Sequence, residues 1–548
     1  MTQLGESEYT PQDDSDESDD EVKDVSIRLC IFFDGTLNNR TNIEQRLLAV
    51  SDEELTAEEQ KEAENLKKKT AVQKTNEDVL LAKPYDSLTV EELEQVDTIL
   101  MDRSRGTPEK LYKKHRAKRD KKTGQTIGEN SYEGYYTNVV KMDRHLNVIA
   151  GETPDYQITL KTYVEGSGSL IKKGDKMSGY ALAMGESGVP EKVEKGVRDA
   201  IKEITKSQPD REVIIKELTF DVFGFSRGAA AARTFINNAL NGKKCLMAGM
   251  ALSGNDEDTS IKAQLVADGY TVTTVNVCFA GLYDTVSTYG LGVISDAIEM
   301  TNDAANNVEA LSLRAVAQAE EVVQLASADE HRFHFSLTNI RSAGGKGTEI
   351  FLPGVHSDIG GGYRDTVTET LVLRGSHDFV DIILHGNYPS LQEAQDDRDK
   401  LVNAGWYKDS EIFVEPVIEK DGEIRWATLR VERSGKNTAG IRNSYSRIPL
   451  NFMVKKARVK KIVFEGKFDD DEFVPRELDM VNQEIQDYVA KHEGKGAFTS
   501  KPRDWHDVKR TPWLRELRHD YCHFSARMET GHDPRIKNNQ RKRMTHNG

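Results

Sequence analysis

The chain has 548 residues, a formal net charge of −16 and a sequence pI of about 5.4. Its length corresponds to one large domain with insertions or to two or three domains. The acidic balance argues against a nucleic-acid-binding protein and against simple electrostatic capture by anionic lipid.

We expect no targeting signal at the start of the sequence. Residues 1–24 are acidic and polar and predict a disordered tail. No basic segment followed by an apolar one precedes the core, so we expect no secretory signal peptide, and no apolar run is long enough to span a bilayer. If the protein acts outside the cytoplasm in which it is made, another carrier must move it.

From residue 25 onward, apolar runs alternate with helical patterns. This alternation predicts an α/β core over residues 25–365, with a mostly parallel sheet covered by helices on both faces. Residues 42–130 are dense in Glu and Lys at helical spacing, and we interpret them as a helical insertion into that core. The predicted strands are 25–33, 213–223, 272–280 and 348–352, and the predicted helices are 228–240 and 304–328.

Residues 366–548 have a different pattern, typical of an α+β region. The segments 411–418 and 423–431 are strand-like, and Lys420-Asp421-Gly422 between them is a turn signal, so we expect an antiparallel hairpin. The sequence from Asp533 onward is basic and polar and is predicted to fray.

One motif carries the chemistry. Gly224-Phe225-Ser226-Arg227-Gly228 has the form G-x-S-x-G and stands between a predicted strand and a predicted helix. In an α/β-hydrolase, this turn must be sharp enough to lift the serine above the sheet, and glycines on either side allow it. We therefore predict that Ser226 is a nucleophile, with Gly224 and Gly228 as the glycines of its elbow.

A catalytic serine needs a base and an acid that orients the base, and in this fold they follow in the order Ser, Asp, His. Asp284 and His356 each follow a predicted strand, which places them at the same sheet edge as Ser226. His331 is the rival base, but its charged neighbours at a predicted helix end favour a structural role. Asp358 is the rival acid, but it lies too close to His356 in sequence to orient the ring easily.

The oxyanion hole is expected to use the backbone N–H of Arg227, with a second donor from Gly35 or Thr36 after the first strand. The same Asp-Gly-Thr segment is also typical of haloacid-dehalogenase-type phosphatases. Their nucleophilic aspartate would occupy position 32, where this chain has Phe32, so that chemistry lacks its nucleophile. The four widely spaced cysteines form no zinc motif, and we expect neither a metal nor a cofactor.

Taken together, several segments resemble a family of bacterial α/β-hydrolases, and within it the first class of type VI secretion lipase effectors. The resemblance covers most of the chain from about residue 26 and is weak over 42–130. The segments are FFDGTLNN (32–39), YYTNVVKM (135–142), YVEGSGS (163–169), GFSRGAAAAR (224–233), GLYDTV (281–286), ADEHR (328–332), LPGVHSDIGGGY (352–363), SYSRIPLNFM (444–453) and LRHDYCHFSA (517–526).

The resemblance implies an antibacterial phospholipase that cleaves fatty acyl esters of glycerophospholipids, with Ser226, Asp284 and His356 as its triad. It also implies docking on the spike protein of the secretion machine, action in the periplasm of a rival bacterium, and a cognate immunity protein. A lipid substrate requires an apolar cover, for which residues 289–294 and the 42–130 insertion are candidates. The alternatives are a cytoplasmic esterase or thioesterase of a non-lipid substrate and a non-catalytic binding protein. The presence of all three triad residues and both elbow glycines disfavours a non-catalytic binding protein.

Overall fold

The protein is described by a computed structural model, which places residues 24–84, 87–119, 126–127, 130–148, 155–176, 187–242, 258–288, 308–375, 389–418, 422–436, 439–465, 473–491, 498–528, 532–537 and 539–548. The predicted acidic tail lies outside these ranges except for Asp24, and so does the candidate cover at 289–294. Within the placed residues, no helix is both long enough and apolar enough to cross a membrane.

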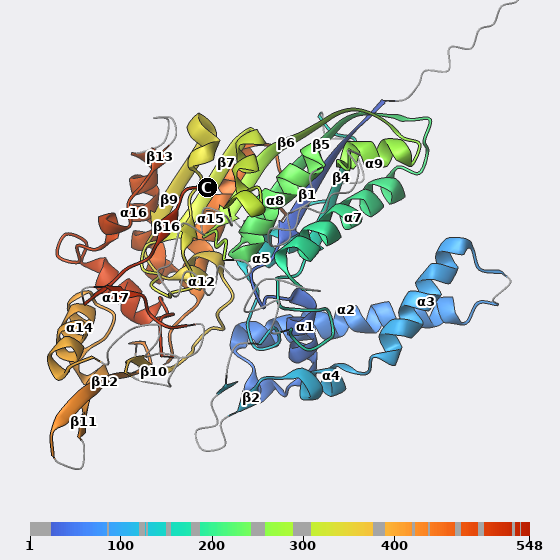
Figure 1. Cartoon of the computed structure of the whole chain (residues 1–548). Coiled ribbons are helices and arrows are strands. Elements are labelled where there is room, and N and C mark those ends of the chain that lie inside the picture. Colours follow the sequence, from blue (N-terminus) through green and yellow to red (C-terminus); the bar gives the residue numbers. More distant parts are fainter. Residues whose placement is uncertain are drawn as a thin grey trace, which may run out of the picture.

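A seven-stranded sheet forms the centre of the molecule (Figure 1). Its order is β13-β9-β7-β6-β5-β1-β4, and every neighbouring pair is parallel. The predicted α/β fold with a mostly parallel sheet is therefore confirmed. The strands are β1 (Asp24–Phe33), β4 (Ile158–Val164), β5 (Ile214–Phe225), β6 (Thr271–Tyr283), β7 (Glu321–Ser327), β9 (Gly347–Leu352) and β13 (Phe498–Thr499).

Helices cover both faces of this sheet, which is why its strands read as nearly continuous apolar runs. In β1, Ile31 and Phe33 pack into one core with α7 (Val189–Ser207), α8 (Arg227–Asn241) and α9 (Ile261–Ala267). Cys30 and Phe32 alternate with them and face α5 (Asn138–His145) and α15 (Arg447–Val459). Because the strands are parallel, the loops after β1, β5, β6 and β9 all emerge at one edge.

The part of the chain between β1 and α5 forms a helical arm (Figure 1). Helices α2 and α3 extend away from the sheet, and each begins at a threonine that forms a capping box, Thr56 with Glu59 and Thr89 with Glu92. The elements are α1 (Arg40–Ala49), η1 (Asp52–Glu54), α2 (Ala57–Leu81), α3 (Val90–Ser104), α4 (Pro108–His115), β2 (Lys118–Arg119) and β3 (Thr126–Ile127).

The C-terminal part adds a three-stranded antiparallel sheet of order β10-β12-β11. It contains the expected hairpin, although the turn residues 419–421 lie outside the placed residues. The remaining elements are β10 (Glu369–Arg374), α14 (Leu391–Asn403), η5 (Asp409–Glu411), β11 (Ile412–Ile418), β12 (Ile424–Arg433), η7 (Ser444–Ser446), η8 (Arg476–Leu478), α16 (Asp479–Ala490), η9 (Pro502–Trp505), α17 (Trp513–Asp520), β14 (Ile536–Lys537), β15 (Gln540–Arg541) and β16 (Thr545–His546).

Two predictions were wrong. The stretch predicted as a helix over 304–328 contains η3 (Leu313–Gln318) followed by strand β7, while 304–307 lie outside the placed residues. Its last part, EVVQLAS, is buried on both faces between β6 and β9, and this packing outweighs the helical propensity of Ala and Glu. The sequence from Asp533 onward does not fray, because β16 pairs with β8 (Leu337–Thr338).

Candidate active site

Ser226 occupies a strained turn between β5 and α8. Its backbone lies at φ 59° and ψ −126°, and its N–H donates to the Tyr283 carbonyl at 3.0 Å. A Cβ on Gly224 would lie 2.4 Å from the Gly228 carbonyl oxygen, and one on Gly228 would lie 2.2 Å from the Asp34 carbonyl oxygen. Both positions therefore require glycine, and the turn has the geometry of a nucleophile elbow.

Asp284 follows β6 immediately, also with a positive φ of 47°. Its N–H donates to the Leu325 carbonyl at 2.8 Å, and its carboxylate accepts from the N–H and the hydroxyl of Ser327, each at 2.9 Å. The side chain is completely buried. Strand β7 thus fixes both the backbone and the carboxylate of Asp284.

His356 begins the short helix α12 (His356–Gly360) just after β9. Its Nδ1 lies 2.5 Å from Oδ2 of Asp284, and its ring packs between Phe225 and Phe335 with centroid distances of 4.5 and 5.0 Å. An ionised carboxylate only accepts hydrogen bonds, so Nδ1 carries the proton and Nε2 is an acceptor. This Nε2 is buried and has no hydrogen-bond partner among the placed residues.

The electrostatics favour a neutral imidazole beside an ionised carboxylate. Burial lowers the pKa of His356 by more than Asp284 raises it. Burial acts to raise the pKa of Asp284, but the charges and hydrogen bonds of Arg543 and His356 outweigh it and hold that pKa well below its usual range. At neutral pH, Nε2 of His356 is therefore free to accept a proton.

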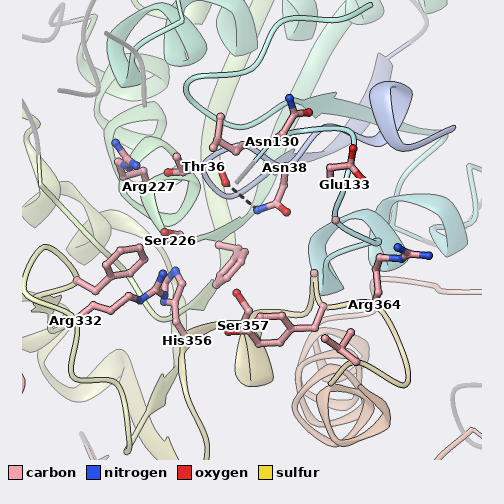
Figure 2. A pocket seen from close by; sticks show the side chains of 17 residues that line it. Thr36, Asn38, Asn130, Glu133, Ser226, Arg227, Arg332, His356, Ser357 and Arg364 are labelled. Atoms are coloured by element: carbon pink, nitrogen blue, oxygen red, sulfur yellow. Dashed lines mark hydrogen bonds between the residues drawn. The ribbon is translucent and has the colours of Figure 1, made fainter. Parts of the chain in front are cut away.

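Ser226 and His356 line a common cavity of about 270 Å³ (Figure 2). In Figure 2 they lie on one side of it with Arg332, and Glu133 and Arg364 lie on the other. The apolar part of the lining comes from Leu37, Phe225, Phe335, Tyr363 and Val367. Among the placed residues, no cluster of His, Cys, Asp or Glu is arranged to hold a metal ion.

The loop after β1 forms another part of this cavity wall. The Asp34 carboxylate accepts from the hydroxyls of Thr137 and Tyr163 and from the N–H of Gly35, at 2.7, 2.7 and 2.8 Å. Burial raises the pKa of Asp34 to about 6, although these hydrogen bonds lower it. Because the Gly35 N–H is engaged, Thr36, which lines the cavity, is the remaining candidate from this loop for an oxyanion donor.

Residues 250–384 match the family model described as "T6SS, Phospholipase effector Tle1-like, catalytic domain". The matched segment contains Asp284 and His356, and Ser226 precedes it. The resemblance to the type VI phospholipase effectors is confirmed.

The fold is also similar to that of a solved Tle1 effector bound to the VgrG spike of the type 6 secretion system. The TM-score is 0.51 at 20% identity, over 92% of this chain and 85% of that one. An uncharacterised protein from Pseudomonas aeruginosa aligns with a TM-score of 0.27 at 17% identity, over 63% of this chain and 43% of that one. A search of curated proteins found no match.

His331 and Asp358, the alternatives to His356 and Asp284, do not take part in the Asp284–His356 pair. His331 does not line the cavity that contains Ser226. Asp358 accepts from the N–H of Val355 at 2.9 Å, and its Oδ1 lies 3.0 Å from Nδ1 of His523, so it caps α12 and binds a different imidazole. Of Asp284 and Asp358, Asp284 is thus the one whose carboxylate contacts the His356 ring.

Two features of the site were not predicted from the sequence. Glu330 accepts from Arg332, from the hydroxyl of Ser525 and from the N–H of His356. Burial acts to raise the pKa of Glu330, but the Arg332 guanidinium outweighs it and lowers the pKa to about 2. Arg543 binds the Asp284 carboxylate through both of its terminal nitrogens. The Glu330–Arg332 pair is local and lies within ADEHR (328–332), whereas the Arg543–Asp284 pair joins residues that only the tertiary fold brings together.

Proposed function

We propose that this protein is a type VI secretion phospholipase effector that hydrolyses fatty acyl esters of glycerophospholipids with Ser226, His356 and Asp284. The observation that carries the proposal is the buried Asp284–His356 hydrogen bond, whose imidazole shares one cavity with a serine held in an elbow turn. The Tle1-like family match supports the phospholipid substrate class.

In the proposed mechanism, Nε2 of His356 takes the proton of Ser226 as Oγ attacks the ester carbonyl carbon. The amides of Arg227 and Thr36 donate to the oxyanion. The ester C–O bond then breaks, the imidazolium protonates the leaving oxygen, and a lysophospholipid departs. His356 next deprotonates a water molecule, which attacks the acyl-enzyme. The fatty acid leaves and the Ser226 hydroxyl is restored.

The direct test is fatty-acid release from vesicles of phosphatidylethanolamine and phosphatidylglycerol by the purified protein, alongside a soluble short-chain ester. Release from vesicles supports the proposal. Hydrolysis of the short ester without release from vesicles would instead favour an esterase or thioesterase of a non-lipid substrate. If a fluorophosphonate also fails to label Ser226, the chain is a binding protein on a hydrolase fold.

Delivery and immunity belong to the same proposal. The similar Tle1 effector is bound to a VgrG spike, and we infer that this chain docks on a spike protein of its own producer and acts in the periplasm of the target cell. We also infer a cognate immunity protein in the producer. Co-purification of the full chain with the spike proteins of its producer tests the docking, and failure to co-purify with any of them would count against this route.

The acidic limb of the pH profile for kcat/KM is expected below 6.5, the ordinary histidine value. His356 acts as a base only when neutral, and because burial lowers its pKa, it stays neutral to a lower pH than an exposed histidine. Hydrolysis of a soluble ester between pH 4 and 9 measures this limb. A limb at or above 6.5 would show that the Asp284 charge outweighs burial.

We expect the helical arm to contribute more to the hydrolysis of phospholipid in vesicles than to the hydrolysis of a soluble short-chain ester. Asn130 and Glu133, which close the arm segment, line the cavity, and buried Glu59 of α2 binds both Arg46 and the cavity residue Arg364. Replacing Glu59 by Gln leaves Arg46 without its buried counter-charge, which costs about 3–5 kcal/mol locally and loosens the arm.

We therefore expect Glu59→Gln to lower the vesicle rate about tenfold more than the short-ester rate. Glu92→Gln is the matched control, because Glu92 caps the next arm helix but pairs with Lys83 at the exposed surface. Equal losses on the two substrates would remove the arm as a cover for lipid.

A further inference from the structure

The last placed segment of the chain runs along the active-site side of the core. Residues of β16 pair in parallel with β8, and the segment is held further by bonds from Leu337 to the Met544 carbonyl and from Asn339 to the His546 carbonyl, each at 2.9 Å. The N–H of Gly548 donates to the Asn339 side chain at 3.1 Å. This pairing sets the position of Arg543, the residue just before it.

The Arg543 guanidinium binds both oxygens of the Asp284 carboxylate, including Oδ2, which also contacts His356. Nη1 lies 2.6 Å from Oδ1 and Nη2 lies 2.9 Å from Oδ2 of the carboxylate. Two further bonds hold the guanidinium, since Nε donates to the Phe335 carbonyl at 2.7 Å and Nη1 to the Ser327 hydroxyl at 2.9 Å. The side chain is 10% exposed and that of Asp284 is 0% exposed, so little water screens the pair.

This arrangement does two things for the carboxylate. The planar fork adds two bonds to those from Ser327, and together they restrain the carboxylate with Oδ2 directed at Nδ1 of His356. It also places a positive charge against the group whose negative charge attracts a proton to the imidazole. Asp284 thus holds the His356 ring through a hydrogen bond, while the Arg543 charge weakens the stabilisation that Asp284 gives to the protonated ring.

We propose that Arg543 is a positioning residue of the triad, which fixes the orientation of Asp284 and limits how strongly that carboxylate favours the imidazolium form of His356. The inference rests on the proposed triad and goes beyond it. It assigns a role in the reaction to residues 539–548, far from the G-x-S-x-G motif.

A pH signature follows from the groups that face the pair. His356 is faced by Asp284, Glu330 and Arg332, and Asp284 in turn by Arg543 and Glu349. Removing the Arg543 charge leaves two carboxylates and one guanidinium facing the imidazole, and no guanidinium paired with Asp284. The protonated ring then becomes more favourable, so the acidic limb of the reaction moves to higher pH.

The matched control is Arg541, two residues earlier. Its guanidinium binds the buried carboxylate of Asp397 through Nε at 3.3 Å and Nη2 at 2.8 Å, away from the cavity. Arg541→Met therefore removes a similar buried pair from the same segment without touching Asp284. It measures what loss of anchoring alone does.

The experiment follows the rate at which a fluorophosphonate labels Ser226 between pH 4 and 9, in wild type, Arg543→Met, Arg543→Lys and Arg541→Met. For Arg543→Met we expect labelling at pH 7 to slow about tenfold to a hundredfold, below the ~10⁴-fold that loss of the acid itself costs, and the limb to rise by about one pH unit. Arg543→Lys should label more slowly than wild type, because a lysine lacks the bidentate geometry of the guanidinium. Its acidic limb should stay at the wild-type pH, because the positive charge is kept. Arg541→Met should keep the wild-type limb.

The proposal would be overturned if Arg543→Met and Arg541→Met had equal labelling rates and the same acidic limb as wild type. The segment would then have a purely structural role. If Arg543→Met does not fold, Arg543→Lys decides alone, and a wild-type labelling rate in it overturns the proposal. Absence of labelling in wild type is a different result, because it removes the proposed triad itself.

Discussion

Replacing Ser226 by alanine is expected to lower kcat for fatty-acid release by about 10⁴- to 10⁶-fold, with little change in KM. The substitution removes the attacking oxygen and nothing that holds the substrate. Alanine adopts the positive φ of this turn with about the same strain as serine, so the free energy of unfolding should stay close to that of wild type. Initial rates on vesicles and a thermal unfolding curve measure both.

Ser446→Ala is the matched control for this prediction. Ser446 is also a buried serine at the start of a helix, but its hydroxyl donates to the Asn443 carbonyl and it does not line the cavity. Its rates should stay within a few-fold of wild type. Activity of Ser226→Ala within tenfold of wild type would show that another group is the nucleophile.

The second large effect is expected for Asp284→Asn, which should lower kcat about 10⁴-fold at neutral pH. The asparagine amide can donate to Nδ1 of His356, and the proton then sits on Nε2, where it blocks acceptance of the serine proton. The same change removes the counter-charge of Arg543, which leaves a buried guanidinium unpaired at a cost of about 3–5 kcal/mol. We therefore expect a lower Tm together with the loss of rate.

Asp358→Asn separates these two effects. Asp358 is likewise buried and pairs with an imidazole, that of His523, but it does not contact His356. The variant should be destabilised and keep kcat within about tenfold of wild type when measured below its unfolding transition. If both aspartate variants lost the same activity, the loss would reflect general destabilisation, and Asp284 would have no specific role as the acid.

Local patterns were sufficient to predict the central features of the fold and site. The G-x-S-x-G motif carries its own context, a buried strand before it and a helix of small residues after it, and both are present as β5 and α8. The order of Ser226, Asp284 and His356 could be inferred because parallel strands end at one edge. The structure joins Asp284 to His356 by the hydrogen bond that this order implies.

Other features could not be predicted because they depend on distant partners. Strand β7 follows an Ala- and Glu-rich stretch that favours a helix, and its Val322 and Val323 together with its position between β6 and β9 favour a strand. The Gly35 N–H is engaged by the side chain of its own neighbour, which no pattern reveals. Arg543 belongs to a basic, polar stretch whose composition is that of a frayed end, and its partner stands 259 positions earlier.

That separation also concerns the order in which the site is completed during synthesis. A ribosome that has translated as far as residue 530 has already made Ser226, Asp284 and His356, but not Arg543 or the strand that pairs with β8. At that stage the strands from β1 to β9 have been made, while the guanidinium that binds Asp284 has not. The contact between Asp284 and Arg543 can therefore form only later in synthesis than the contact between Asp284 and His356.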